Sequence, residues 1–391
     1  MNRPAPDLHP PAARGNTRRY RVVVAERILC HYRVAFYESL RRRLLRHGVE
    51  LVLLAGTPSA AELLKQDAAT LDWMLPLTTR YLLGNRLCWQ PFGSLAATAD
   101  LVIVLHENKL LYNLWLLFGR RPRRLAFWGH GCNLQSRAPN GVRERFKRWT
   151  VFKADWWFAY TDLTARLLTQ AGYPRDAVTV VDNATDTAAL QAACDGMEAA
   201  ALAQFRRRHG LRPGPTGLFL GSLYRDKRLD FLFAAAAQIR TVVPDFQLLV
   251  VGAGPQQALV TQQVAATDWV HYAGPLRGAD KAAALVTADV LLNPGLVGLG
   301  ILDSFASGTP MFTTDCRLHS PEIDYLDPDR NGVMTSDDVG AYVNAVTQAL
   351  LQPQRLALLA DNARRSAARY TINNMSQRFC AGVLACLGRQ A

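Results

Sequence analysis

A repeated alternation of short apolar runs with amphipathic helical stretches most constrains the fold of this chain. Runs that are apolar throughout predict strands buried on both faces, and strand–helix alternation predicts a parallel sheet with helices on both sides. We therefore predict an α/β fold with two doubly wound, Rossmann-like domains. The runs lie at 20–25, 49–54, 100–105, 124–128, 156–159 and 178–181, and then at 217–220, 246–251, 270–272, 290–292 and 311–313.

A break in this pattern divides the sequence into two domains, for which 391 residues give enough room. Ligands of doubly wound domains bind beyond the carboxyl ends of the strands, so we expect a cleft between the two domains. The predicted parts are a disordered Pro/Ala-rich tail at 1–19 that lacks the apolar core of a signal peptide, a first domain at 20–187, a connector at 188–215, a second domain at 216–369, and a last helix at 370–391 for which packing back on the first domain is one option.

Positive charge is concentrated in the first half of the chain. The formal net charge is +13; residues 1–190 hold 27 Lys and Arg against 15 Asp and Glu, and residues 191–391 hold 18 against 17. A basic surface attracts nucleic acid or anionic lipid. No nucleic-acid-binding motif is present, and two basic stretches, 109–124 and 143–153, contain interleaved aromatic residues. This pattern favours a membrane surface, although a solvated basic face or core helices with charged outer sides would look the same.

The rest of the composition indicates the class of protein and its cellular compartment. A hydrophobic fraction of 49% with 20% charged residues is typical of a globular protein. No apolar run reaches the roughly 18 residues that a membrane-spanning helix needs. The seven cysteines are scattered without a Cys-x-x-Cys pair, which favours a reducing compartment over a disulfide framework or a zinc site. We expect a cytoplasmic protein that is peripheral on the cytoplasmic face of the inner membrane.

The segment 291–310 carries the strongest local signal for a binding site. A buried strand ends at Asn293-Pro294, a glycine-containing loop follows, and a helix is predicted to start near Leu299 with Asp303 on its first turn. The free N–H groups at the start of a helix bind anions, and the nearby carboxylate can accept hydrogen bonds from hydroxyl groups. This arrangement suits a ligand with both a diphosphate and a sugar, such as a sugar nucleotide.

Several further segments follow this loop pattern in order and spacing, and with them the chain resembles retaining glycosyltransferases of the family 4 type, which have the GT-B fold. The resemblance implies two facing Rossmann-like domains, the first binding an acceptor and the second a sugar nucleotide. It also implies a hexosyltransferase that needs no cofactor and no metal for its chemistry. The matching segments are 219–230, 250–255, 291–310, 319–326 with Asn331-Gly332, and, in the first half, 128–131 and 181–186.

The resemblance assigns donor contacts to the loop after the strand at 217–220. Gly221 lies at its start, and Arg225 and Lys227 are expected to bind the donor diphosphate and to stabilise it as it departs. The family usually has an arginine directly after the glycine; this chain has Ser222 there, so Arg225 is expected to take that role. The alternative is an ordinary solvated run of charges.

Asp303 occupies the place of the second of two family glutamates that are separated by seven residues, and it is expected to bind the ribose hydroxyls. The first glutamate position falls on Gly295, which is a departure from the family pattern. Backbone N–H groups at Gly298 and Leu299 are expected to contact phosphate or sugar. A helix-capping role is the alternative for Asp303.

Five remaining positions complete the expected site. His130, between two glycines after a strand, is expected near the transferred sugar as a catalytic residue, with a structural histidine in a tight turn as the alternative. His31 and Arg33 are expected on the acceptor side. Gly254 is expected beside the nucleotide in a loop where a nicotinamide fingerprint is not favoured, because Gln257 replaces its third glycine. The base is expected near Leu276.

The function implied is transfer of a sugar from a GDP- or UDP-sugar to an acceptor hydroxyl with retained anomeric configuration. The expected acceptor is a lipid-linked saccharide in polysaccharide, O-antigen or lipopolysaccharide assembly. The resemblance also implies front-face attack, in which the departing phosphate receives the acceptor proton. Asp327-Pro-Asp329 is interpreted as a turn, not a metal pair. The alternatives are a sugar-nucleotide epimerase of the same fold, a non-catalytic sugar-nucleotide binder and, more distantly, a nucleic-acid-binding protein.

Overall fold

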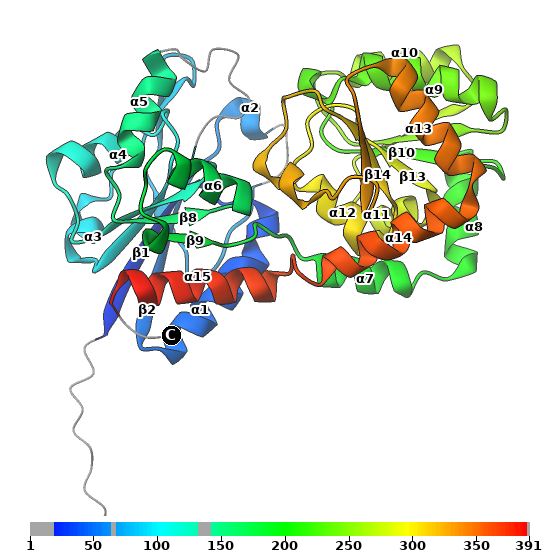
Figure 1. The fold of residues 1–391 in the computed structure, drawn as a ribbon. Helices are drawn as coiled ribbons and strands as arrows, with labels where there is room; N and C mark the ends of the chain where they lie inside the picture. Colours follow the sequence, from blue (N-terminus) through cyan, green and yellow to red (C-terminus); the bar gives the residue numbers. More distant parts are fainter. Residues whose placement is uncertain (1–18, 64–67, 132–141, 389–391) are drawn as a thin grey trace, which may run out of the picture.

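The computed structural model describes residues 19–63, 68–131 and 142–388, which form two α/β domains facing each other (Figure 1). Each domain has a parallel sheet covered by helices, so the predicted fold class is confirmed. The strands are buried because helices shield both sheet faces; Val22, Val23 and Val24 of the first strand are at most 1% exposed. This is why the apolar runs of the sequence show no polar alternation.

The first domain contains a sheet of seven strands in the order β3-β2-β1-β6-β7-β8-β9, all paired in parallel. A small antiparallel hairpin, β4 (Arg80–Leu82) and β5 (Leu87–Trp89), lies apart from it. The sheet strands are β1 (Tyr20–Ile28), β2 (Val49–Gly56), β3 (Leu75–Leu77), β6 (Leu101–Leu105), β7 (Leu125–Gly129), β8 (Trp156–Ala159) and β9 (Val178–Val180). Its helices are η1 (His31–Arg33), α1 (Val34–Arg46), α2 (Ala60–Leu63), α3 (Gly93–Thr98), α4 (Leu111–Leu114), the π-helical turn η2 (Trp115–Gly119), α5 (Val142–Val151), α6 (Asp162–Gln170) and η3 (Arg175–Ala177).

The second domain repeats this plan with six parallel strands in the order β12-β11-β10-β13-β14-β15. The strands are β10 (Thr216–Leu220), β11 (Gln247–Val251), β12 (Val270–Gly274), β13 (Val290–Leu292), β14 (Met311–Thr314) and β15 (Gly332–Thr335). The helices are η4 (Arg225–Lys227), α9 (Leu229–Val242), α10 (Gln257–Ala266), α11 (Gly278–Thr287), α12 (Gly300–Ser307), η5 (Pro321–Tyr325), α13 (Val339–Leu351) and α14 (Pro353–Ala367).

Three further helices connect the domains. The segment predicted as a connector, in which an Ala-rich helix was expected, contains α7 (Thr187–Asp195) and α8 (Ala199–Arg208), which pack against α11 and α12 of the second domain. The chain then returns: α15 (Ile372–Cys386) leaves the second domain and packs along α1 of the first (Figure 1). Its Phe379 ring stacks on Phe158 of β8 at 4.1 Å between centroids. The last helix is thus part of the first domain's core.

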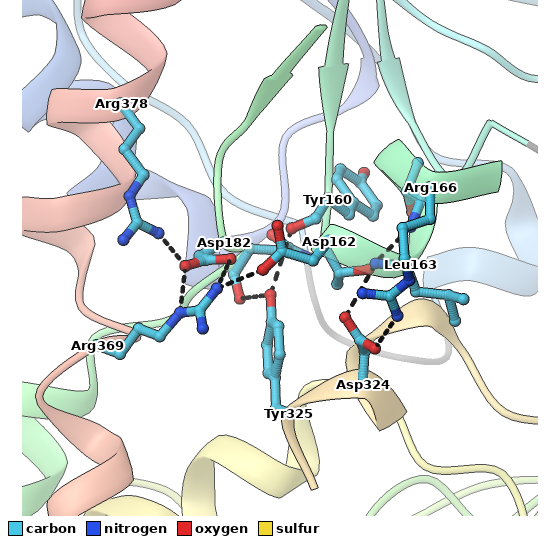
Figure 2. Close-up of polar contacts among 12 residues, drawn as sticks. Tyr160, Asp162, Leu163, Arg166, Asp182, Asp324, Tyr325, Arg369 and Arg378 are labelled. Carbon is cyan, nitrogen blue, oxygen red and sulfur yellow. Dashed lines mark hydrogen bonds and ion pairs between the residues drawn. The ribbon is translucent and has the colours of Figure 1, made fainter. Parts of the chain in front are cut away.

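Polar contacts across the domain boundary are centred on two aspartates (Figure 2). Asp324 of η5 accepts hydrogen bonds from the Leu163 backbone N at 2.9 Å and from Arg166 at 2.6 Å, at the start of α6. Asp182, after β9, is 1% exposed and pairs with Arg369 at 2.8 Å and with Arg378 of α15. These contacts fix the second domain and the returning helix against the carboxyl end of the first sheet.

Replacing Asp182 by asparagine is expected to lower the free energy of unfolding by about 2 kcal/mol. This is less than the roughly 3–5 kcal/mol for a fully buried pair, because Arg369 and Arg378 are 49% and 38% exposed. Asparagine tolerates the positive φ of 51° at this position, so backbone strain does not contribute. Thermal unfolding followed by circular dichroism measures the change. The control is Asp162→Asn, which removes a surface partner of Arg369 and should cost less than about 1 kcal/mol. Equal losses in the two variants would contradict the assignment.

Candidate functional site

The two sheets place their loops around one cavity of about 300 Å³ between the domains. In each sheet the strand order reverses at one point, between β1 and β6 in the first and between β10 and β13 in the second. Loops diverge at such points and leave a crevice at the carboxyl ends of the strands. Of the four loops, those after β1 and β6 and the one after β13 contribute to the cavity wall. The architecture therefore makes this cavity the candidate site.

The loop after β13 is held by a buried histidine. The backbone N of Val297 donates to Nδ1 of His319 at 3.0 Å, and Nε2 of His319 contacts the carbonyl of Thr314 at 2.8 Å. Burial lowers the pKa of His319, and a neutral ring with its proton on Nε2 satisfies both contacts. The loop is therefore fixed before any ligand binds.

Lys227 braces the same loop from the side of β10. Its Nζ donates to the carbonyl oxygen of Leu296 at 2.5 Å, and its side chain is buried. Burial lowers the pKa of Lys227 to about 8. Gly221 leaves the space beside this side chain open, since a Cβ there would lie 3.7 Å from Cε of Lys227. Lys227 thus brings one cation to the loop without lining the cavity itself.

Gly295 has no space for any side chain. A Cβ at this position would lie 2.3 Å from the carbonyl oxygen of Asp226 and 2.7 Å from that of Lys227. The Leu296 backbone N donates to the Asp226 carbonyl at 2.8 Å, which holds the two segments together. The missing family glutamate is therefore not a simple truncation, because in this chain the backbone of η4 occupies the place of the side chain.

The start of α12 contributes the other donor-side positions. Gly298 and Leu299 line the cavity, and the helix begins at Gly300, one residue after the predicted start. Asp303 lies in the first turn, and its carboxylate pairs with Lys281 of α11 at 2.7 Å. The Asp303 side chain is 14% exposed. A sugar hydroxyl would therefore share this carboxylate with Lys281.

The remaining donor-side predictions lie around this centre but not on the cavity wall. Arg225 is exposed in η4, and Leu276 is half-buried after β12. Gly254 packs against backbone, since a Cβ there would lie 2.5 Å from the carbonyl oxygen of Leu223. The glycine at 254 thus has a packing role in joining the loops after β10 and β11.

The first domain contributes Arg33 and His130 to the cavity, whereas His31 is exposed and does not line it. Arg33 is 6% exposed, and its guanidinium lies 4.7 Å from the Trp128 ring centroid and 5.6 Å from that of Tyr160. The His130 ring packs edge-on against Tyr160 at 4.8 Å. A rigid aromatic wall therefore positions both groups, and the arginine brings positive charge to the acceptor side.

Carboxylates and an amide that were not among the predicted site residues complete the cavity. Glu26, Glu107 and Glu322 line it together with Asn183. Burial raises the pKa of Glu26, which accepts a hydrogen bond from Tyr37 at 2.6 Å. Asn183 donates to Glu322 at 2.5 Å, while its own Oδ1 is buried and has no hydrogen-bond partner among the described residues. Such acceptors suit the hydroxyl groups of a sugar. The sequence could have indicated Glu26 and Glu107 as site residues, because each lies near the end of an apolar run that predicts a strand.

No group of three or more potential metal ligands occurs in the parts of the chain that the structure describes. Asp327 and Asp329, interpreted from sequence as a turn, lie in a turn in which the Arg330 backbone N donates to the Asp327 carbonyl at 3.0 Å. Their carboxylates pair with Arg330 and Arg355, each at 3.2 Å. Among the same described residues, no helix is long and apolar enough to cross a membrane.

Comparison with known proteins supports this reading of the fold. The family model for glycosyl transferases group 1 matches residues 214–352. A phosphatidyl-myo-inositol mannosyltransferase of Mycobacterium leprae is 30% identical over 159 residues, 39% of this chain and 40% of that protein. The chain thus spans less than half the length of this curated relative.

Solved structures match nearly the whole chain. Anabaena HepE in complex with UDP superposes with a TM-score of 0.67 at 15% identity, covering 94% of this chain and 100% of that one. WaaG, a glycosyltransferase involved in lipopolysaccharide biosynthesis, gives 0.62 at 13% identity, with 92% and 98% coverage. The two facing parallel-sheet domains and the cavity between them define the GT-B class. The match to the glycosyl transferases group 1 model runs from just before β10 to the end of α13, so the similarity in sequence is to the second domain.

Proposed function

We propose that this protein is a retaining hexosyltransferase that moves a sugar from a nucleotide diphosphate to an acceptor hydroxyl. The observation that carries the proposal is the fixed loop from Asn293 to Leu299, which Lys227 braces and which faces Arg33 and His130 across the cavity. A preorganised helix start with adjacent cations is suited to a departing diphosphate. The family match of the second domain and the UDP bound by HepE agree with a sugar-nucleotide donor.

In this proposal the donor lies on the second domain. The diphosphate contacts the N–H groups of Gly298 and Leu299, with Lys227 and Arg225 as cations, and the ribose hydroxyls contact Asp303. Nζ of Lys227 would donate to a phosphate oxygen, either in place of the Leu296 carbonyl or in addition to it. Binding donor and acceptor together in this cavity would remove much of the entropic barrier to transfer.

The acceptor side would be the wall formed by the first domain. Glu26, Glu107 and the buried Oδ1 of Asn183 can accept hydrogen bonds from sugar hydroxyls. The departing phosphate would receive the proton of the attacking hydroxyl, and His130 would contact the transferred sugar. We propose a lipid-linked saccharide as acceptor, in surface polysaccharide, O-antigen or lipopolysaccharide assembly, with the enzyme peripheral on the cytoplasmic membrane face and with no metal or other cofactor.

One observation favours a second function. Because Gly295 has no room for the family's first glutamate, the transferred sugar would be held without that carboxylate. A protein that binds a sugar nucleotide without transferring its sugar fits the same geometry. The two functions differ in turnover and not in donor binding.

A screen of UDP- and GDP-sugars with native lipid extract, read by mass spectrometry, tests these functions. Transfer predicts a glycosylated lipid and free nucleotide diphosphate only when both donor and extract are present. A new sugar nucleotide formed from donor alone would indicate an epimerase. Calorimetric donor binding without any product would indicate a binder, and absence of donor binding would refute the proposal.

Replacing Asp303 by asparagine is expected to weaken donor binding about tenfold, which is the effect of losing one charge-assisted hydrogen bond of roughly 1.4 kcal/mol. The value of kcat should change less, because ribose binding is equal in ground and transition states. Calorimetry and initial rates measure the two effects. Lys281→Met is the matched control, since it removes the ion pair but keeps the Asp303 carboxylate. Equal weakening in both variants would show that Asp303 acts only through Lys281.

A further inference from the structure

Five aromatic side chains on one part of the first domain are partly exposed. They come from η2, from α5 and from the residue that follows α5. We term this set the aromatic face: Trp115 (50% exposed), Phe118 (53%), Phe146 (37%), Trp149 (49%) and Phe152 (45%). Single exposed apolar residues are normal on a protein surface, but a group of large rings marks an interaction site.

Contacts among three of these rings join η2 to α5. Phe118 of η2 stacks on Trp149 of α5, with centroids 5.2 Å apart and planes at 8°. Phe146 lies one turn before Trp149 on α5, at 5.8 Å. Pairing the rings in this way fixes their orientation but leaves roughly half of each paired ring exposed. The rings are therefore not explained by the core of the domain.

Positive charge surrounds the aromatic face. Nζ of Lys153 lies 4.9 Å from the Trp149 ring centroid, and Arg120 and Arg145 are exposed next to Phe118 and Phe146 in the chain. The sequence of α5 contains Arg143, Arg145, Lys147 and Arg148 against the single acidic Glu144. Arg121 pairs with Asp155 at 2.7 Å. A fitting partner offers an apolar region to the rings and negative charge to the basic residues around them.

We propose that the aromatic face binds the surface of an anionic lipid bilayer, with its rings at the boundary between headgroups and acyl chains. Aromatic rings with lysine and arginine around them are suited to that layer, and each basic residue close to an anionic surface adds to the attraction. This inference rests on the proposed function, because a membrane-held acceptor gives the enzyme a reason to bind the bilayer. Glu107, which lines the interdomain cavity, also borders a small hollow with Leu114, Leu117 and Phe146. An acceptor held in the membrane would thus reach the cavity from the aromatic face.

Sedimentation of the full-length protein with sucrose-loaded vesicles tests the proposal without donor or acceptor. We expect binding to vesicles of phosphatidylglycerol and phosphatidylcholine, and at least tenfold weaker binding to phosphatidylcholine alone. The variant Trp115→Ser/Phe118→Ser/Trp149→Ser should reduce binding to the anionic vesicles about tenfold or more. The matched control is Leu351→Ser/Leu358→Ser, which removes side chains of 61% and 60% exposure from the second domain and should bind as the unchanged protein does.

A second variant separates charge from ring insertion. Arg145→Glu/Lys153→Glu keeps all five rings and should lose binding to anionic vesicles, whereas fluorescence quenching by acyl-brominated lipids should report ring insertion for the unchanged protein only. Circular dichroism verifies that each variant is folded. Equal binding of the ring variant and its control would overturn the proposal, as would a dimer that the ring variant converts to monomers without any vesicle binding. Donor turnover without vesicle binding would refute this inference alone, and vesicle binding without donor binding would refute the proposed function alone.

Discussion

Replacing Lys227 by methionine is expected to lower kcat/KM about 100- to 1000-fold, the range found when one preorganised donor to a developing negative charge is removed. Methionine keeps most of the buried stem but removes the cation and the hydrogen bond to the Leu296 carbonyl. Because that bond also braces the donor loop, the affinity for the donor should fall as well. Initial rates with the donor found by screening, together with calorimetry, measure both effects.

The pH dependence gives an independent test of the same residue. Since the pKa of Lys227 is about 8 in the free protein, the ammonium is present below that pH and is lost above it. The value of kcat/KM, which reports ionisation of the free enzyme, should therefore fall as pH rises through about 8. This fall should be absent in Lys227→Arg, whose guanidinium stays charged. Arg225→Met removes the second cation proposed for the diphosphate but keeps the Lys227 amine, so its activity should be lower while the fall near pH 8 remains. A flat pH profile with near-normal turnover of Lys227→Met would refute the assignment.

Replacing Gly295 by alanine is expected to destabilise the second domain by about 3 kcal/mol, at the upper end for overpacking, and to abolish measurable donor binding. The added Cβ would lie 2.3 Å from the carbonyl oxygen of Asp226, so the loop after β13 or the η4 turn must move. Gly295→Glu, which restores the family residue, should be at least as harmful and should not raise turnover. Thermal unfolding and calorimetry measure these losses.

Gly300 provides the matched control for Gly295. It lies in the same segment, and a Cβ there would meet nothing within 4 Å. Gly300→Ala should therefore leave the unfolding midpoint unchanged or slightly raised, because alanine favours the first turn of a helix more than glycine does. Normal stability and donor affinity in Gly295→Ala would mean that the loop is soft, and the proposed fixed donor site would then be wrong.

The sequence alone determined the fold class and much of its detail. Apolar runs such as Val22–Val24 can only be strands covered on both faces, and the structure confirms two parallel sheets built from them. The start of α12 was predicted to within one residue, because a strand, a Pro-Gly turn and a helix are specified by residues close together in the chain. The packing of the helices in the connector was missed, since Ala-rich stretches do not indicate which surface they will cover.

Only the tertiary structure decided what the individual site residues do. Glu26, Asn183 and Glu322 line one cavity although they lie far apart in sequence, because the carboxyl ends of strands from both sheets meet between the two domains. From the sequence, Gly295 marked the loss of a family carboxylate. The structure shows that the η4 backbone beside Gly295 leaves no space for any side chain at this position. The burial that lowers the pKa of Lys227 and the exposure of the aromatic face both depend on which segments pack against these side chains. Periodicity and turn chemistry act over a few residues, whereas steric exclusion, desolvation and surface exposure depend on which distant segments happen to be neighbours.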